Sequence, residues 1–250
     1  MKKLAVRRQV SRLPRELRIA ELMTAARAVF KEKGYADALT SEIAERAGVV
    51  EGTIYRYFDN KRDLLIKVLE QWYVEIISDY EKQLKHVSGT WNRLRFMVWH
   101  HLSVLHLEPV LCRLVLLEMR PAPDYRQTIV FDMNREYTLR TIEIIEAAVA
   151  SGEFRSGLSL ALVRDMIYGA IEHHTWAYLR GEGDFSADQV ADSLADMVYR
   201  ALATHPRVEA PVPDAHQLTQ AIERLEKIAD RLEVPAALAT KRSGLAKARS

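Results

Sequence analysis

Residues 50–61 bring small, hydroxyl and aromatic side chains together in one short segment. Ile54 and Phe58 lie four positions apart, so in a helix they share one buried face, while their neighbours point outward or sideways. A helix of this composition fits the major groove of DNA and can be held there by contacts with phosphates. The outward-pointing side chains therefore indicate DNA binding; they belong to Val50, Glu51, Thr53, Tyr55, Arg56 and Tyr57.

A second short helix, expected over residues 40–47, must hold this segment in place. Ile43 and Ala47 share its buried face because they lie four positions apart. Gly48 can adopt a left-handed backbone conformation without a Cβ penalty, so it ends the helix and turns the chain. Thr40 is a suitable N-cap at the other end. The two segments and the glycine between them predict a helix-turn-helix.

The apolar pattern is helical almost throughout the chain, which predicts an all-α fold. Helices are expected over residues 15–34, 40–47, 50–58, 60–86, 89–107, 109–120, 124–151, 159–180 and 187–203. Asn60 is a suitable N-cap for the fourth of these helices. Ser186 and Gln189 form a capping box that opens the last one. We find no convincing strand pattern and no internal repeat in the sequence.

Charge and proline content divide the chain into five parts. A basic N-terminal arm (1–14) precedes a three-helix helix-turn-helix domain (15–62), which is followed by a larger helical effector-binding and dimerisation domain (63–204). A proline-rich linker (205–213) leads to an amphipathic helix and basic tail (214–250). The arm suits contacts with phosphates or a minor groove, although a solvated terminus would have the same composition.

The bulk composition describes a folded protein with a full core. Of its 250 residues 48% are hydrophobic, and the net charge of +2 argues against a nonspecific polycation. The single cysteine, Cys112, excludes an internal disulfide and fits a reducing cytoplasm, where we expect a buried, inert thiol. We expect no signal peptide and no membrane span, because no apolar run is long enough.

Three spaced motifs in residues 16–66 resemble the tetracycline-repressor (TetR) family of bacterial transcription regulators. They are Ala25-Ala26-x3-Phe30-x3-Gly34-Tyr35, Thr40-x2-Ile43-Ala44-x2-Ala47-Gly48-Val49 and Gly52-Thr53-Ile54-Tyr55-x-Tyr57-Phe58-x2-Lys61-x2-Leu64. From residue 67 to residue 204 the resemblance lies in the number and order of helices. The resemblance implies an all-helical homodimer that binds a palindromic double-stranded DNA operator and is released by a small hydrophobic ligand.

The resemblance also implies a role for individual residues. It assigns a phosphate contact to Thr40, base-edge or methyl contacts to Thr53 and Tyr55, close backbone approach to Gly52, a backbone clamp to Tyr57 and Lys61, and sequence reading to Val50 and Arg56. The two tyrosines could instead pack against the first helix of the motif. Glu51 departs from the family pattern, because many relatives carry a basic residue at this position. A carboxylate beside phosphates opposes binding unless it accepts from a cytosine amino group.

The larger helical domain is expected to sense a ligand, since a protein that only binds DNA needs no such body. Most of its apolar side chains must form the core, and the remainder can line a pocket between helices. The candidate ligand-binding residues are Trp99, Leu102, Leu105, Phe131, Tyr137, Tyr168 and Trp176. We expect no cofactor apart from this effector and no enzymatic activity.

Residues 165–174, together with Trp176, resemble the corresponding helix in family members that respond to fatty acyl-CoA thioesters. Gly169 inside this helix suggests close helix contact or room for a ligand, because glycine is unfavourable there by about 1 kcal/mol relative to alanine. The helix could equally belong to a dimer interface. Candidate partners for the CoA phosphates are Arg93, Arg95, Arg113 and Arg120.

Two other functions remain open at this point. The pairs His100-His101 and His173-His174 could contribute to a metal-dependent enzyme or a metal sensor, if one histidine from each pair met across helices. Neighbouring residues on a helix point about 100° apart, so neither pair chelates one metal by itself, and no cysteine or acid completes a zinc set. We therefore assign no metal site. The other alternative is an architectural DNA-binding protein without a ligand.

Overall fold

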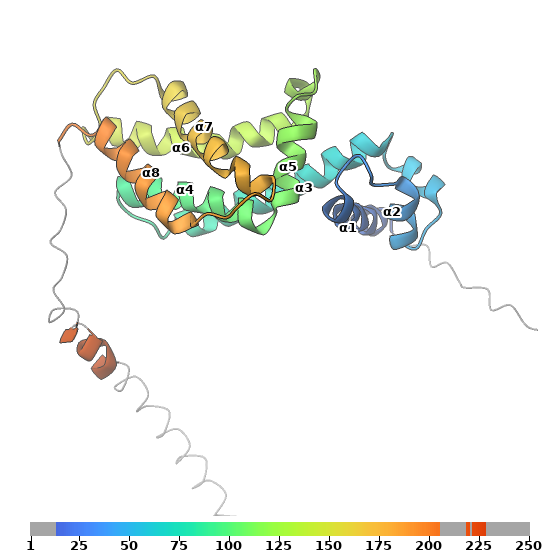
Figure 1. Ribbon diagram of the computed structural model, residues 1–250, viewed down its shortest axis with the longest axis horizontal. Coiled ribbons are helices and arrows are strands. Elements are labelled where there is room, and N and C mark those ends of the chain that lie inside the picture. Colours follow the sequence, from blue (N-terminus) through green and yellow to red (C-terminus); the bar gives the residue numbers. More distant parts are fainter. Residues whose placement is uncertain (1–13, 206–218, 221, 229–250) are drawn as a thin grey trace, which may run out of the picture. The chain divides into compact units, whose positions relative to one another are not determined.

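The computed structural model describes residues 14–205, 219, 220 and 222–228. Its elements are α1 (Arg15–Lys33), α2 (Thr40–Arg46), η1 (Glu51–Arg56), α3 (Lys61–Leu84), α4 (Thr90–Leu107), α5 (Pro109–Arg113), η2 (Leu114–Met119), η3 (Tyr125–Gln127), α6 (Ile129–Ala150), α7 (Leu160–Leu179) and α8 (Ala187–Leu202). Figure 1 shows them along the chain. The expectation of an all-α fold is confirmed, and the described residues contain no strand beyond a single bridge between Phe154 and Ala203.

The chain divides into two compact units, 1–206 and 207–250. In the second unit residues 219, 220 and 222–228 are helical, and Ile222, Leu225 and Ile228 are each more than half exposed. The basic arm before Pro14, the proline-rich linker after His205 and the basic tail lie outside the described residues. The expectations for those segments stay predictions.

The structure corrects the expected recognition helix. Residues 50–58 were expected to form one helix, but η1 is a 3₁₀-helix limited to residues 51–56. The amides of Thr53 and Tyr57 donate to carbonyls three residues earlier, at 2.8 and 2.9 Å. A segment this short, with Gly52 in its first turn, has little intrinsic helical stability, so packing rather than propensity fixes its geometry.

The turn between α2 and η1 follows the expected geometry. Gly48 has a φ of 67°, in the left-handed region. The amide of Val49 then donates back to the carbonyl of Ala44 at 2.9 Å, which closes the end of α2. Ile43 and Ile54 are fully buried on the facing sides of α2 and η1. This turn therefore fixes how η1 is presented on the surface.

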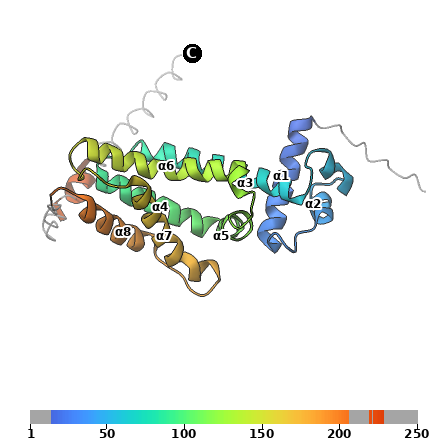
Figure 2. The same cartoon turned by 90° about the horizontal axis from the view of Figure 1, so that it is seen from above.

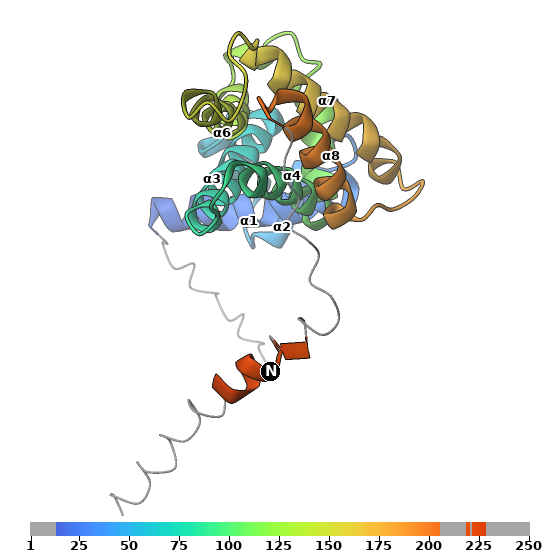
Figure 3. The ribbon, with the colours of Figure 1, turned by 90° about the vertical axis from the view of Figure 1, so that its left-hand side faces the viewer.

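Helix α3 is the longest helix and connects the N-terminal three-helix domain to the larger helical body. Asn60 caps it as expected, since its side chain accepts from the amide of Asp63 at 3.0 Å. Figure 2 shows α3, α4 and α6 running lengthwise through the body, and Figure 3 shows them nearly end on. Helix α8 packs on α4, α6 packs on α3, and α7 packs on α6.

The segment expected as one helix over residues 109–120 changes type along its length. It starts as α5, with Pro109 at its first position, and continues as the π-helix η2. The amide of Arg120 donates to the carbonyl of Val115, five residues earlier, at 2.9 Å. π-Helical turns are rare and are often found at functional sites. Among the described residues, no helix combines the length and the apolar content that crossing a membrane would require.

Candidate nucleic-acid interface and ligand cavity

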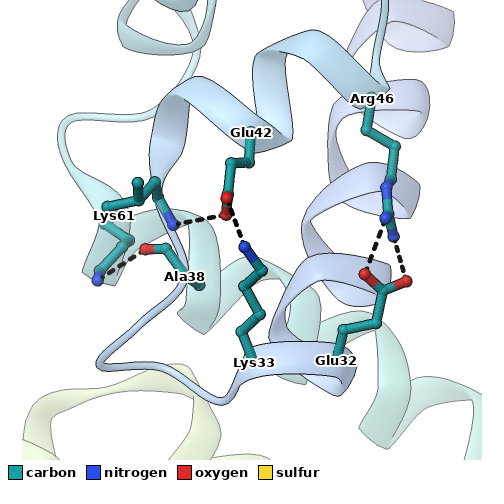
Figure 4. Close-up of polar contacts among 7 residues, drawn as sticks. Glu32, Lys33, Ala38, Glu42, Arg46 and Lys61 are labelled. Carbon is teal, nitrogen blue, oxygen red and sulfur yellow. Dashed lines mark hydrogen bonds and ion pairs between the residues drawn. The ribbon is translucent and has the colours of Figure 1, made fainter.

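Ion pairs hold the helix-turn-helix against α1 (Figure 4). Arg46 of α2 donates to both carboxylate oxygens of Glu32 on α1, at 2.5 and 2.8 Å. Lys33, at the end of α1, pairs with Glu42 of α2, and the same carboxylate accepts from the amide of Leu39 at 3.5 Å. These pairs join charged side chains on the surface and link α2 to the end of α1.

The face of η1 that was expected to meet DNA is on the surface. Val50 is 76% exposed and Tyr55 is 52% exposed, while Ile54 between them is fully buried. Glu51, Gly52 and Arg56 are also exposed, and Thr53 and Tyr57 are half-buried. Tyr57 packs partly against the core, whereas Tyr55 is more exposed. The individual DNA contacts stay predictions.

Thr40 begins α2 and does not cap it, so the expectation of an N-cap is wrong. The preceding residue, Leu39, occupies the cap position. The Thr40 hydroxyl instead donates to the carboxylate of Glu51 and lies 3.1 Å from the phenol oxygen of Tyr55. Three residues expected near DNA thus form one hydrogen-bonded cluster across α2 and η1. In this cluster the Thr40 hydroxyl already donates its hydrogen bond to the Glu51 carboxylate, so it is not free to donate to a phosphate.

The ammonium group of Lys61 is engaged within the protein. It donates to the backbone carbonyls of Tyr35, Ala36 and Ala38 at 2.8, 3.3 and 3.0 Å, and it lies 4.5 Å from the centre of the Tyr35 ring. Figure 4 shows the contact with Ala38. These carbonyls belong to the loop between α1 and α2, so Lys61 fixes that loop. Its proposed contact with the DNA backbone stays a prediction.

Charged side chains also connect the N-terminal domain to the body. Arg27 of α1 pairs with Glu75 of α3 at 2.7 Å and with Glu108, at the start of α5, at 3.0 Å. Lys31 of α1 pairs with the other oxygen of Glu108 at 2.8 Å. These contacts could not be predicted from the sequence, because the partners lie far apart in the chain. They place the beginning of α5 directly against the DNA-binding domain.

A cavity of about 70 Å³ lies in the body between α3, α4, α5, η2, α6 and α7. Its lining is mostly apolar. The residues that surround it are Trp72, Tyr73, His101, Leu105, Cys112, Val115, Leu116, Arg120, Asn134, Thr138, Tyr168, Glu172 and Thr175. Cys112 is a buried thiol whose pKa is raised to about 12 by burial, so it is an inert part of this wall, as expected.

A second hollow, of about 380 Å³, lies beside the cavity, and we call it the basic vestibule. It shares Arg120, Asn134, Thr138 and Tyr168 with the cavity. Its remaining lining residues are Arg126, Phe131, Arg135, Arg164 and Asp165. An apolar cavity and a hollow lined by several arginines therefore lie next to one another, where η2, α6 and α7 meet.

The arginines of the basic vestibule differ in how they are neutralised. Arg120 donates to Glu172 at 2.7 Å, and Arg164 pairs with its neighbour Asp165 at 2.7 Å. Arg126 and Arg135 are exposed and form no ion pair with any residue that the structure describes. The vestibule thus has an excess of positive charge and presents guanidinium groups that suit bidentate binding of phosphates.

Two of the seven expected ligand-binding residues, Leu105 and Tyr168, line the cavity. Phe131 lines the basic vestibule, and Tyr168 lines both. The other four lie elsewhere: Leu102 and Tyr137 are buried in the core, the ring of Trp99 lies 6.0 Å from that of Phe96, and Arg180 lies over the ring of Trp176.

The arginines named for the CoA phosphates need a similar correction. Only Arg120 lies at the vestibule. Arg93 donates to the carbonyl of Val87, Arg95 pairs with two aspartates of α8, and Arg113 donates to the carbonyl of Leu179. Sequence reasoning missed Arg126, Arg135 and Arg164. A usable signal existed for the last two, because each lies four positions from an aromatic residue of the same helix, Phe131 or Tyr168.

The histidine pairs do not form a metal site. His100 is buried between the phenol of Tyr137, at 3.1 Å, and Asp79, at 3.3 Å. His101 lines the cavity, and its burial lowers its pKa to about 3, so the ring is neutral. His173 and His174 are exposed on α7. In the part of the chain that the structure describes, no three potential ligands gather, so the metal alternative has no support.

Helices α7 and α8 together expose an apolar groove of about 380 Å³. Met166 of α7 is 64% exposed and Met197 of α8 is 61% exposed. The other residues along the groove are Val163, Ile167, Ala170, Leu194, Val198, Ala201 and Leu202. Gly169 also faces open space, since a Cβ added there would meet no atom within 4 Å. Such a contiguous apolar surface is typical of a protein–protein contact.

Comparison with protein families gives two matches. Residues 22–68 match the model for bacterial regulatory proteins of the tetR family. Residues 88–202 match the model for a tetracyclin repressor-like C-terminal domain. The two matches cover the helix-turn-helix and most of the helical body.

Similar proteins extend over most of the described chain. The fatty acid metabolism regulator protein of Bacillus subtilis (strain 168) is 27% identical over 178 residues, which cover 71% of this chain and 92% of that protein. The HTH-type transcriptional repressor KstR2 of Mycolicibacterium smegmatis is 23% identical over 184 residues, covering 71% and 87%. A crystal structure of the transcriptional regulator FadR from Bacillus subtilis in complex with stearoyl-CoA has a TM-score of 0.65 at 27% identity, covering 73% and 98%.

Proposed function

The chain belongs to the TetR family of bacterial regulatory proteins, and from that premise we propose that it is a dimeric repressor released from its operator by a long-chain acyl-CoA. It is a DNA-binding transcriptional regulator, as its family and its similar proteins are. Three parts of this function are proposed: that the protein represses rather than activates transcription, that it forms a dimer, and that its effector is a long-chain acyl-CoA. Each rests on a separate feature of the structure.

The observation that carries the effector proposal is the contact between an apolar cavity and the basic vestibule. An acyl-CoA has the same two parts, because it joins a hydrocarbon chain to a head that bears phosphates. The shared residues Arg120 and Tyr168 put both environments within reach of one ligand. A similar protein was crystallised with stearoyl-CoA, which supports this choice of ligand.

Binding of such a ligand requires the cavity to widen. Its volume of about 70 Å³ is well below the roughly 300–1,000 Å³ of ordinary ligand pockets. An acyl chain must therefore push apart the helices that line the cavity. A ligand that fits only the widened body shifts the population toward that body by its differential affinity.

Helix α3 provides a direct route from the cavity to the DNA-binding domain. Its Trp72 and Tyr73 line the cavity, and its first residue, Lys61, holds the loop before α2. A displacement of α3 by the ligand changes the distance between the two recognition segments of a dimer. Half-sites on B-DNA lie about 34 Å apart, so a wider spacing loses one set of contacts.

The apolar groove between α7 and α8 is the proposed dimer interface. A twofold-related copy can cover Met166 and Met197 with the same groove, because a symmetric dimer uses one surface twice. Gly169 lies on the exposed side of α7 and permits close approach of a second backbone. Two copies in this arrangement present two recognition segments to a palindromic operator.

The test uses the purified full-length protein and duplexes selected from a palindromic library. We expect a dimer that prefers one palindrome at moderate ionic strength, and we expect hexadecanoyl-CoA to release it. CoA alone, which lacks the hydrocarbon chain, and hexadecan-1-ol, which lacks the phosphates, serve as controls and should release it weakly. A monomer without sequence preference would overturn the function, whereas unchanged operator affinity with hexadecanoyl-CoA would overturn the effector.

A further inference from the structure

Two side chains that line the cavity carry a buried polar atom without a hydrogen-bond partner. The indole nitrogen Nε1 of Trp72 is one, and the ring nitrogen Nδ1 of His101 is the other. Trp72 is only 4% exposed, so water outside the protein does not reach its N–H group. Buried polar groups in folded proteins are nearly always hydrogen-bonded, so each such exception requires an explanation.

The other polar side chains around the cavity already have partners. Tyr168 and Thr141 share a hydrogen bond of 3.0 Å, and Tyr73 donates to Asn134 at 3.1 Å. Arg120 is paired with Glu172, as described above, and Thr175 and Thr138 donate to backbone carbonyls of their own helices. Trp72 and His101 are thus the unsatisfied members of this wall, as far as the structure describes it.

The two groups come from different helices and differ in chemistry. Trp72 of α3 offers an N–H donor only. His101 of α4 is neutral because burial lowers its pKa, and a neutral imidazole can carry its one proton on Nδ1. The same cavity is also lined by the apolar side chains of Leu105, Val115 and Leu116. A ligand atom that satisfies both groups must accept two hydrogen bonds, as a carbonyl oxygen does.

We propose that Trp72 and His101 form a binding site for the thioester carbonyl oxygen of the effector. This inference rests on the function proposed above and specifies its ligand further. The phosphates bind in the basic vestibule, the hydrocarbon chain fills the apolar space, and the carbonyl oxygen accepts from Trp72 Nε1 and His101 Nδ1. The site therefore distinguishes an activated fatty acid from a ligand of equal length and charge that lacks the carbonyl.

The test compares two ligands that differ by one oxygen atom. Hexadecanoyl-CoA carries the thioester carbonyl, and S-hexadecyl-CoA is the thioether with the same chain and the same head. We expect the wild-type protein to bind the thioester at least about fivefold more tightly than the thioether, since fivefold is the ratio expected for one net hydrogen bond. Calorimetric titration of the full chain, and release from operator, give two independent readouts.

Substitutions test whether Trp72 and His101 are the side chains that bind the thioester carbonyl oxygen. Trp72→Phe keeps an aromatic ring but removes the N–H group, so it should weaken binding of the thioester and leave binding of the thioether unchanged. Trp176→Phe is the matched control, because Trp176 lies away from the cavity, and it should preserve the fivefold ratio. Operator affinity without ligand and the circular dichroism spectrum report whether each variant is folded.

The outcomes are separable. Equal affinity of the wild-type protein for the two ligands would overturn the carbonyl site while leaving an acyl-CoA effector in place. The same conclusion follows if Trp72→Phe weakens both ligands equally, since the N–H group would then bind another oxygen, such as an amide of the pantetheine arm. If neither ligand binds, the proposed effector itself fails. His101→Phe, expected to reduce the ratio as Trp72→Phe does, provides a second variant if the first does not fold.

Discussion

The hydroxyl of Thr40 donates a hydrogen bond to the carboxylate of Glu51, across the turn that joins α2 to η1. The residue expected to contact a phosphate is therefore bonded to an acid on the same surface. A contact between Thr40 and a phosphate, as expected from the sequence, would replace this bond, and the negative charge of Glu51 would oppose the approach of the DNA backbone. We therefore expect Glu51 to lower the affinity of the protein for duplex DNA.

We predict that Glu51→Gln strengthens DNA binding. The substitution removes the charge but keeps a hydrogen-bond acceptor, and exposed charges interact by about 0.2–1 kcal/mol, so affinity should rise up to about fivefold. Fluorescence anisotropy with operator and with a random duplex measures both affinities. Glu45→Gln, an exposed acid of α2 outside this cluster, is the control for a general charge effect. A loss confined to the operator would show that Glu51 reads a cytosine.

A second prediction concerns the loop between α1 and α2. Lys61→Met should destabilise the protein by about 1–3 kcal/mol, because three carbonyls lose a charged donor and remain partly buried. Chemical denaturation measures this change. Lys67→Met on the same helix removes only a surface pair with Glu70 and should change stability by less than about 0.5 kcal/mol. Similar values for the two variants would contradict a structural role for Lys61.

Because Arg120 and Glu172 form an ion pair, we predict that substitutions of these two residues have opposite effects on ligand binding. Glu172→Gln removes a carboxylate beside the basic vestibule and frees Arg120, so hexadecanoyl-CoA should bind up to about fivefold more tightly. Arg120→Gln should weaken binding. Glu182→Gln, which breaks the pair with Arg180 beyond the end of α7, is the control and should have no effect. Weaker binding by Glu172→Gln would indicate that the pair shapes the site instead.

Met197→Glu should convert the protein to a monomer, because it places a charge in the apolar groove proposed as the dimer interface. Operator affinity should fall with it, since a single recognition segment contacts only one half-site. Analytical ultracentrifugation measures the mass. Val74→Glu changes an equally exposed apolar residue on α3, outside the groove, and should leave the dimer intact. A dimeric Met197→Glu variant would exclude this interface.

Because His101 is buried, we predict that the stability of the folded protein depends on pH. Burial lowers its pKa to about 3, below its usual value near 6.5, so the unfolded chain binds the proton more tightly than the folded one. Stability is therefore full above pH 6.5 and is lost as the pH falls toward 3. Between pH 7 and pH 5 this loss amounts to about 2 kcal/mol for one histidine.

Urea denaturation at both pH values measures the loss, and His101→Gln should reduce it because glutamine does not titrate. His100 adds to the loss in the same direction, since burial also lowers its pKa. The wild-type protein and the His101→Gln variant are both measured without ligand, because a bound ligand would itself stabilise the folded state. Equal losses in the wild-type protein and in His101→Gln would contradict the assignment.

The sequence by itself determined the helical fold and the outward orientation of several η1 side chains. Gly48 and the buried pair Ile54 and Phe58 act over a few residues, so local spacing was enough to orient Tyr55 and Arg56 outward. The limits of the helices followed for the same reason, apart from the 3₁₀ and π-helical segments. There the hydrogen-bond pattern is set by packing with distant elements, which local propensity does not record.

Only the tertiary structure decided where the ligand cavity lies and which charges surround it. Trp72, His101, Arg120 and Tyr168 come from four separate elements, and nothing in their spacing along the chain brings them together. Apolar residues that fill a helical core and apolar residues that line a cavity have the same sequence pattern. The physical reason is that a cavity is a property of how whole helices pack, whereas a turn or a helix face is a property of a few neighbouring residues.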